Sequence, residues 1–486
     1  MRLLLVNTNT CRDPYPVAPL GVCLLASALR DEAEVRVFDG TFRGSEGLRE
    51  TVEDFRPDLV GLSVRNVDDL VPRETTFFLD EIRRAFVNPL REATGAPLVL
   101  GGSAFSLFPL ELMRAWQADY GIVGEGEEAL RTLVRTLEHG GDPRRIPGLL
   151  VAGDREVPAA PRRPAPGPLR IPFSEVDRHI DFGPYRHLGS YPIQARRGCT
   201  HRCIYCTYPA LEGRRHRLRD PEEIAREIAE AADRIPGVTF EFVDSTFNDP
   251  RGHAEAICRA LIRRDLRVRL RTMGVNPGHV TDELLDLMQQ AGFAQIDCTP
   301  DSASPTMIRA MGKNFSPEDL VRTARGIRRR GMPTAWFFLF GGPGETAGTI
   351  RETMDFIDRE VSPEDLVLMG IGLRIYPGTP LHRTAIREGI VSPEEDLVRP
   401  RFYVAPDLGY ERIRDTLEEA AAVRPHCLPP GENRPSPEML RQAVAMRRDQ
   451  GLTEPMFRTL LRIRRSWPRF AGIAAPGNAP VPSVTK

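Results

Sequence analysis

Short apolar segments alternate with helix-length segments twice along this 486-residue chain, before and after a proline-rich stretch. The first series occupies residues 1–140, the proline-rich linker residues 141–190 and the second series residues 191–400. Strands separated by helices favour parallel sheets, because a parallel pair needs a long crossover connection. The length also exceeds what one hydrophobic core usually supports. We therefore expect two α/β domains, then a helical region over residues 401–486 that ends in a disordered tail.

The first series contains five strand candidates, each a leucine-rich or β-branched run bounded by helix-length segments. They cover residues 2–7, 34–38, 58–64, 97–100 and 120–123. Five such strands predict a doubly wound, Rossmann-like sheet, in which ligands bind beyond the carboxyl ends of the strands. The segments "NTNTCRDPYPVAPLG", "SVRNVDD", "GGSAFSLFP" and "GEGE" follow strands and form the expected binding surface.

The second series contains six strand candidates, at residues 192–197, 239–243, 267–272, 295–299, 334–340 and 366–375. Helix signals separate them: "DPEEIAREIAEAA" opens with proline and acids, and "TDELLDLMQQAGF" has an N-cap threonine and a glycine past its end. Six βα units predict a partial (β/α)6 barrel of the TIM type. In such barrels the chemistry takes place at the C-terminal ends of the strands.

Composition excludes several classes of protein. The formal net charge of −1 gives no electrostatic reason to expect nucleic acid as a partner. No apolar run reaches 18 residues, so no membrane span is expected, and the apolar run in "MRLLLVNTNT" is too short for a signal peptide. Eight cysteines without an export signal indicate a reducing compartment. We expect a cytoplasmic protein.

Three of these cysteines lie within eight residues, in the stretch "RRGCTHRCIYC" directly after a predicted strand. Cys199, Cys203 and Cys206 have the spacing C-x3-C-x2-C, and clustered thiols in a reducing compartment more often hold metal than form disulfides. Three thiolates can bind three irons of a [4Fe-4S] cluster and leave the fourth iron open. The alternative is a Cys3His zinc site that includes His201, although a position inside the loop closes a tetrahedron poorly. Without a metal, His201 is expected to face solvent.

With Tyr205 before the last cysteine, the stretch resembles the CxxxCxφC motif, where φ is aromatic, of the radical S-adenosyl-L-methionine (SAM) superfamily. Five further blocks follow successive strands in order: "FVDSTFND", "VNPGHVTDELLDLMQQAGF", "DSASPTMIRAMGKNF", "FLFGGPGET" and "LRIYPGTPL". The resemblance covers residues 191–406. It implies that SAM binds the open iron and is cleaved to a 5′-deoxyadenosyl radical, with an electron from an external flavodoxin-type or ferredoxin-type reductant.

The resemblance also implies which residues contact SAM. Besides Tyr205, they follow the second, fourth and fifth strands of the barrel: Asp244, Ser245, Asp301, Ser302, Gly341, Gly342 and Glu345. The sequence has "DST" where the family commonly has glycine-glycine-glutamate. The two glycines would let the backbone approach adenosine closely, and a plain tight turn is the alternative interpretation.

Residues 1–140 resemble the cobalamin-binding domain of cobalamin-dependent radical SAM enzymes. The resemblance is carried by "PVAPLGVCLLASALR", "FDGTF", "PDLVGLSVRNVDD", "LVLGGSAFSLFP" and "DYGIVGEGEEAL". The D-x-H-x-x-G motif, whose histidine ligates cobalt in many such domains, is missing, because no histidine precedes His139. Either cobalamin binds without a protein imidazole, or the domain has lost it.

Residues at the ends of the strands are the candidates for contacting cobalamin. Arg65 and Asn66 are expected below the cobalt, where a salt bridge from Arg65 to Asp68 or Asp69 is the alternative. The nucleotide tail is expected to pass Gly101, Gly102 and Ser103. Corrin amides are expected to bond to Asp39 and Glu125, both of which could instead cap helices.

The resemblance implies methylation of an unactivated carbon, or of phosphorus, in a small-molecule or natural-product substrate. One SAM would supply the methyl group through cobalamin, and a second would supply the radical. The alternative is a ring contraction, cyclisation or other rearrangement with the same cofactors. A methylthiotransferase would need a second three-cysteine cluster, but the first domain contains only Cys11 and Cys23. An open-iron motif also disfavours a non-catalytic cobalamin-responsive or electron-carrying protein.

Overall fold

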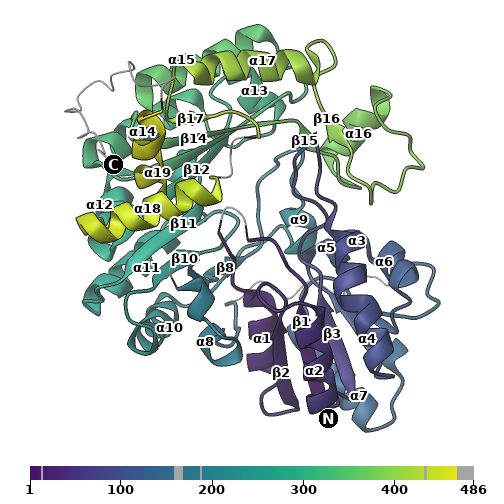
Figure 1. Ribbon diagram of the computed structural model, residues 1–486. Helices are drawn as coiled ribbons and strands as arrows, with labels where there is room; N and C mark the ends of the chain where they lie inside the picture. The colour runs from purple at the N-terminus through teal and green to yellow at the C-terminus, as the bar shows by residue number, and fades with distance from the viewer. Residues whose placement is uncertain (13–14, 158–167, 187–188, 432–434, 468–486) are drawn as a thin grey trace. The chain divides into compact units, whose positions relative to one another are not determined.

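A computed structural model describes residues 1–12, 15–157, 168–186, 189–431 and 435–467. Residues 158–167 and 187–188 of the proline-rich linker, and residues 468–486 with the expected disordered tail, lie outside the described residues. The fold is α/β, as predicted, with two main sheets (Figure 1). The chain divides into two compact units. The first unit comprises residues 1–200, 206–241 and 375–401, and the second comprises residues 201–205, 242–374 and 402–486.

The first sheet has six strands in the order β2-β1-β3-β4-β5-β6. They are β1 (Arg2–Asn7), β2 (Glu34–Asp39), β3 (Leu59–Ser63), β4 (Leu98–Gly101), β5 (Tyr120–Ile122) and β6 (Leu149–Val151). The first five are parallel, as predicted, and β6 adds an antiparallel edge. The apolar side chains of β1 are at most 2% exposed, which explains why this strand was evident from sequence.

Helices follow the strands of the first sheet, and α1 packs beside α7 while α2 packs beside α4. They are α1 (Leu20–Ala28), α2 (Ser45–Phe55), α3 (Phe78–Ile82) continued by the π-helix η1 (Arg83–Val87), α4 (Asn88–Ala93), α5 (Ser103–Leu107), α6 (Pro109–Trp116) and α7 (Glu127–Glu138). This is the doubly wound arrangement expected from sequence. The first unit also contains α8 (Val176–His179), α9 (Tyr208–Leu211), α10 (Pro221–Arg234) and α16 (Pro380–Arg387).

The second sheet has the order β17-β14-β13-β12-β11-β10-β7. Its strands are β7 (Tyr191–Ile193), β10 (Thr239–Phe242), β11 (Arg269–Val275), β12 (Phe293–Asp301), β13 (Thr334–Phe340), β14 (Leu366–Ile371) and β17 (Cys427–Leu428). The pairs from β11 through β14 to β17 are parallel, as a partial barrel requires. The short strand β17 was not predicted.

Two predicted strands are each divided into two pieces. The candidate at residues 192–197 is β7 followed by β8 (Arg196–Arg197), which pairs antiparallel with β9 (Arg217–Leu218). The candidate at residues 366–375 is β14 followed by β15 (Leu373–Arg374), which pairs antiparallel with β16 (Phe402–Tyr403). Both small ribbons begin where a sheet strand has ended, so they shape the loops beyond it.

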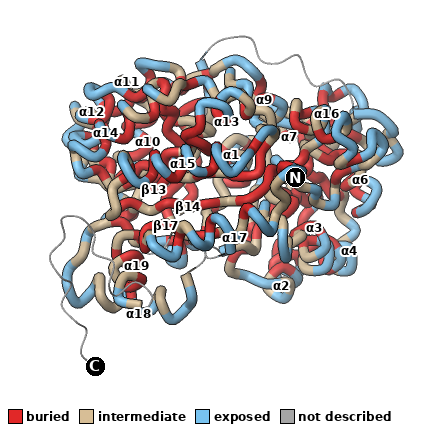
Figure 2. The backbone as a smooth tube through the Cα atoms, turned by 90° about the horizontal axis from the view of Figure 1, so that it is seen from above, coloured by how far each residue is buried: buried red, intermediate tan, exposed pale blue. Residues whose placement is uncertain are grey.

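Capping residues explain the helix limits of the second unit. Thr281 caps α12 with its side chain, and Gly292 ends that helix with φ of +97°, as the sequence predicts. The helices are α11 (His253–Arg263), α12 (Asp282–Ala291), α13 (Pro305–Ala310), α14 (Pro317–Arg330), α15 (Ala347–Glu360), α17 (Gly409–Ala422), α18 (Pro437–Gln450) and α19 (Met456–Arg465). Figure 2 shows β13 and β14 made of buried and intermediate residues, while α11 and α12 carry exposed stretches. Among the described residues, no helix has the length and apolar character needed to cross a bilayer.

The loop after β4 requires a glycine at position 102. Gly102 has φ of +99° and ψ of 174°, a region that is essentially open only to glycine. A Cβ atom there would lie 2.6 Å from the carbonyl oxygen of Val64, just past β3. Val64 also accepts a hydrogen bond from the Ala104 amide at 3.0 Å. The loops that follow β3 and β4 are therefore locked together by backbone contacts.

We predict that Gly102→Ala destabilises the protein more than Gly124→Ala does. Gly124 also has positive φ, +86°, but a Cβ atom there meets no atom within 4 Å. Backbone strain alone costs about 1 to 3 kcal/mol, and the clash with Val64 adds to that cost only at Gly102. Thermal unfolding of the full chain measures the difference. Equal melting temperatures for the two variants would contradict this account of the loop.

Candidate functional site

The three-cysteine loop begins directly after β8. Gly198 has φ of +92°, and a Cβ atom there would collide with the Arg215 carbonyl oxygen. The next residue, Cys199, is 4% exposed, and its amide donates a 3.0 Å hydrogen bond to the Gly213 carbonyl oxygen. Backbone contacts with the segment before β9 therefore fix the start of the loop.

The donor set of the loop fits a four-iron cluster. The eight cysteines all lie in described segments and none forms a disulfide. The described residues contain no group of three or more His, Cys, Asp or Glu side chains that could hold one metal ion. In a [4Fe-4S] cluster each thiolate binds a different iron, so the ligands are not gathered around a single point. Cluster ligation by these cysteines stays a prediction, supported by the number and chemistry of the donors.

The middle of the loop, residues 201–205, rests on the segment that follows β12 and α13. The Ile204 amide donates a 3.1 Å hydrogen bond to the Met311 carbonyl oxygen. Gly312 has φ of +68°, and a Cβ atom there would lie 2.5 Å from the Arg202 carbonyl oxygen. The backbone of the loop thus lies directly against this segment.

Two predicted SAM contacts are brought together here. The Tyr205 hydroxyl donates a hydrogen bond to the carboxylate of Asp301, which is 3% exposed and ends β12. The same carboxylate oxygen accepts a 2.7 Å hydrogen bond from Nζ of Lys313. Lys313 was not predicted as a site residue. The signal that could have identified it is the composition of the chain, because Lys313 and Lys486 are the two lysines in an arginine-rich sequence.

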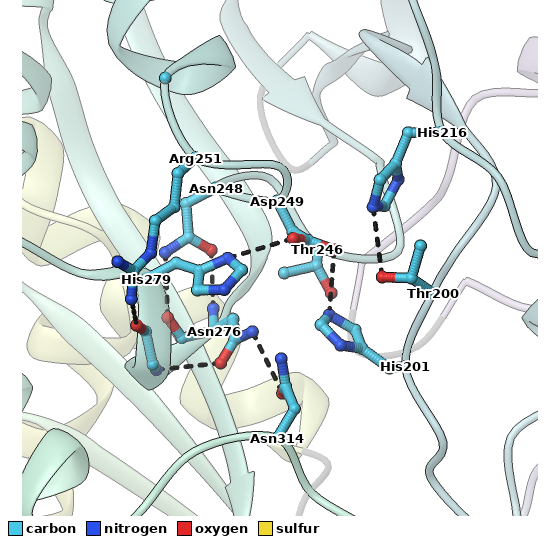
Figure 3. Close-up of polar contacts among 12 residues, drawn as sticks. Thr200, His201, His216, Thr246, Asn248, Asp249, Arg251, Asn276, His279 and Asn314 are labelled. Carbon is cyan, nitrogen blue, oxygen red and sulfur yellow. Dashed lines mark hydrogen bonds and ion pairs between the residues drawn. The ribbon is translucent and has the colours of Figure 1, made fainter. Parts of the chain in front are cut away.

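His201 does not face solvent, contrary to expectation. Its side chain is 10% exposed, and Nε2 lies 3.2 Å from Asp249 Oδ2. Asp249 Oδ1 lies 3.1 Å from Nδ1 of His279, and Figure 3 shows both imidazoles directed at this carboxylate. Both contacts are within ion-pair distance. The prediction failed because Asp249 lies far from His201 along the sequence.

The loops after β10 and β11 are tied together beside this contact. The Asn248 side chain accepts a 2.8 Å hydrogen bond from the Asn276 amide and donates one of 3.0 Å to the Asn276 carbonyl oxygen (Figure 3). The predicted SAM residues Asp244 and Ser245 lie in the same loop after β10; Asp244 is 4% exposed and Ser245 is half-buried. Their contact with SAM stays a prediction.

The other predicted SAM residues take part in the packing of the second unit. The Ser302 hydroxyl lies 3.0 Å from the Thr353 hydroxyl of α15. Glu345 is 3% exposed and accepts hydrogen bonds from the Gly341 amide, at 3.2 Å, and from the Thr349 hydroxyl. Burial raises the pKa of Glu345, and these hydrogen bonds offset only part of the shift. A Cβ atom on Gly342 would lie 3.1 Å from the Met307 side chain, so "GGPGE" forms a compact turn.

The predicted cobalamin residues of β3 and β4 meet at one edge of the first sheet. Ser63 of β3 pairs in register with Gly101 of β4, so the loops that follow start side by side. Ser103 donates a 2.8 Å hydrogen bond to the Arg65 carbonyl oxygen. The Arg65 side chain is exposed, and its neighbour Asn66 is half-buried. The contact of these residues with cobalamin stays a prediction.

Two candidate acids of the first unit have protein partners. Asp39 accepts a 2.8 Å hydrogen bond from Asn7 and one of 2.6 Å from the Tyr185 hydroxyl. Glu125 forms ion pairs with Arg197, at 3.0 Å, and with Arg217. Burial disfavours the charged form of Glu125, but its hydrogen bonds and the two guanidinium charges outweigh burial and lower its pKa. The role of Glu125 toward a corrin stays a prediction.

Two family models match the chain. The radical SAM superfamily model matches residues 193–357, and the B12 binding domain model matches residues 11–134. The second match spans most of the first sheet. The first spans residues from β7 to α15, and includes the cysteine loop.

Three similar proteins each match most of this chain. Tryptophan 2-C-methyltransferase from Streptomyces laurentii is 28% identical over 447 residues, covering 77% of this chain and 72% of the relative. An anaerobic magnesium-protoporphyrin IX monomethyl ester cyclase from Rubrivivax gelatinosus is 26% identical over 382 residues, covering 73% and 65%. The structure of the radical SAM methyltransferase TsrM from Kitasatospora setae, with cobalamin and a [4Fe-4S] cluster bound, superposes with a TM-score of 0.80. It is 26% identical, with 96% of this chain and 99% of that chain covered.

We predict that Glu125→Ala lowers stability even without cobalamin. The side chains of Arg197 and Arg217 are 8% and 9% exposed, so the substitution leaves two buried charges with a lost partner. Glu125 itself is 31% exposed, which reduces the expected loss to about 1 to 3 kcal/mol. Thermal unfolding of the cobalamin-free chain measures this loss.

The matched control is Glu128→Ala. Glu128 pairs with Arg131 on the surface of α7, and its side chain is 76% exposed. An exposed pair contributes little, so the melting temperature should stay unchanged. If Glu125→Ala alters only cobalamin binding and leaves the melting temperature at the wild-type value, the structural role of its ion pairs is wrong.

Proposed function

Because this chain belongs to the cobalamin-dependent radical SAM enzymes, we propose that it methylates an unactivated carbon, or a phosphorus, of a small molecule. The observation that carries this proposal is the similarity to TsrM along 96% of the chain, which includes both the B12 binding domain and the barrel. Tryptophan 2-C-methyltransferase, from which the chain differs at most positions, supports carbon as the methyl acceptor. The identity of 28% leaves the substrate pocket free to differ.

Three cofactors follow from this proposal. Cys199, Cys203 and Cys206 would hold a [4Fe-4S] cluster, and the edge formed by the loops after β3 and β4 would bind cobalamin. When bound, the cluster would pass on the electron that cleaves SAM, and cobalamin would carry the methyl group of SAM. The chain's own part is to orient SAM through Tyr205 and Asp301, and to exclude water from the reacting atoms.

Proposed partners follow from the same chemistry. Reductive cleavage consumes an electron that the chain does not generate, so we propose a flavodoxin or ferredoxin as the donor. An iron-sulfur cluster with an open iron would be oxygen-sensitive, which suits a reducing cytoplasm. We propose no role for nucleic acid.

A rearrangement without methyl transfer is the second candidate. The similarity to the magnesium-protoporphyrin IX monomethyl ester cyclase supports it, because that relative is named for a ring closure and matches 73% of this chain. Both reactions would use the same three cofactors. The products from SAM distinguish them.

We predict that the reconstituted protein transfers the labelled methyl group of SAM. The protein is incubated anaerobically with trideuteromethyl-SAM, a reductant, hydroxocobalamin and tryptophan or other indoles as probes. S-adenosylhomocysteine should form only when cobalamin is present, and a product should gain the label, as mass spectrometry measures. 5′-Deoxyadenosine without any S-adenosylhomocysteine would favour the rearrangement.

Two single cysteine variants, one at a predicted cluster ligand and one elsewhere, test the predicted cluster. Cys203→Ala removes a predicted cluster ligand, and formation of S-adenosylhomocysteine should fall by at least about a hundredfold, as losses of essential groups do. Cys258→Ala alters a thiol buried in α11, whose pKa is raised by burial, and should retain the activity. Full activity in the Cys203 variant would exclude the predicted cluster.

A further inference from the structure

Lys313 is a nearly buried lysine in a chain whose positive charge is almost entirely arginine. The sequence has 66 lysine and arginine residues, of which two are lysines, Lys313 and the C-terminal Lys486. The side chain of Lys313 is 9% exposed. A lysine differs from an arginine in presenting a compact charge on a flexible stem, whereas a guanidinium presents a rigid planar fork. A site that must bring one cation to one carboxylate oxygen favours the lysine.

The ammonium group of Lys313 lies at such a site. Its Nζ donates to Asp301 Oδ2 at 2.7 Å and to the Thr299 carbonyl oxygen at 3.3 Å. The hydroxyl of Tyr205 donates to the same oxygen, Oδ2 of Asp301. The Asp301 side chain is 5% exposed, and a buried carboxylate without a counter-ion is costly. Lys313 therefore stabilises the charged acceptor that holds the Tyr205 hydroxyl.

Tyr205 connects the Lys313–Asp301 ion pair to the cysteine loop. It lies between Cys203 and Cys206, directly before the last cysteine of the loop. The neighbouring Met311 and Gly312 contact the loop backbone, as described above. The segment that carries Lys313 thus contacts the loop both through its backbone and through a buried ion pair.

We propose that Lys313 is a positioning residue for SAM, which acts by holding Asp301 as the acceptor for Tyr205. The inference rests on the proposed function, because Tyr205 is predicted to contact SAM. Loss of the ammonium group removes the contact that anchors the carboxylate, so the tyrosine hydroxyl no longer has an acceptor at a fixed position. The ring of Tyr205 then has no fixed orientation toward SAM, although the rest of the barrel is unchanged.

The test is a double-mutant cycle on SAM affinity, measured by equilibrium dialysis of labelled SAM against anaerobically reconstituted protein. K313M removes the charge, and Y205F removes the hydroxyl while keeping the ring. Each should raise the Kd for SAM about tenfold, the effect of one charge-assisted hydrogen bond. The double variant should also show about a tenfold rise, because both changes remove the same contact. If the role of Lys313 were purely structural, the variants would have fewer SAM sites per chain. Their Kd values would then not show the equal tenfold rises.

R330M is the matched control. Arg330 of α14 is 15% exposed and pairs with Asp282 at 2.7 Å and with Asp286 at 2.6 Å, so it tests the loss of an ion pair unrelated to the loop. Its Kd should equal that of the wild type. Wild-type affinity in K313M, or a hundredfold rise in the double variant, would overturn the inference. K313Q provides the same cycle if K313M does not fold. Failure of the wild-type chain to bind SAM would instead overturn the proposed function.

Discussion

Parallel strands bring their carboxyl ends to one edge of a sheet, and the candidate sites of this protein depend on that constraint. In the first sheet Asn7, Ser63 and Gly101 lie in register at the ends of β1, β3 and β4. In the second, Asp301 at the end of β12 pairs with Phe338 of β13. Loops that are far apart in sequence therefore begin side by side. The sheet thus brings together the few polar residues on those loops that can form a ligand site.

The loops at these edges are fixed by short, specific contacts. Gly102 packs against the backbone that follows β3, and Asn248 bonds to both backbone groups of Asn276. Asp301 receives Tyr205 from the cysteine loop. These contacts use backbone groups or buried side chains, so few rotatable bonds remain to be ordered when a ligand binds. Such pre-organisation is what a reaction through a reactive radical requires, because a misplaced substrate or a water molecule would quench it.

Sequence patterns identified the helices and strands whose conformation is determined by residues close by in the sequence. The strands β1 and β13 were predicted with their observed limits, because each is a continuous apolar run bounded by polar residues or turns. The strands β6 and β17 were missed, because three and two residues carry too little pattern and pairing at a sheet edge decides their conformation. The helix α12 was evident from its cap residues, which act within one turn of the chain.

The site was predictable in its motifs but less so in its partners. The cysteine spacing and the aromatic residue between the last two cysteines are local signals. The contacts of His201 with Asp249, and of Glu125 with Arg197 and Arg217, join segments far apart along the chain, and no local pattern encodes them. The importance of Lys313 likewise depends on a tertiary contact with Asp301.

The central claim is that three cysteines hold a four-iron cluster in a chain that also carries a cobalamin-binding domain. Anaerobic reconstitution with iron, sulfide and hydroxocobalamin, followed by metal analysis and an optical spectrum, tests this claim most directly. The account predicts about four irons and four sulfides per chain, as one [4Fe-4S] cluster contains, together with one bound cobalamin. Zinc at the cysteines in place of iron, or a chain that retains no cobalamin, would contradict it.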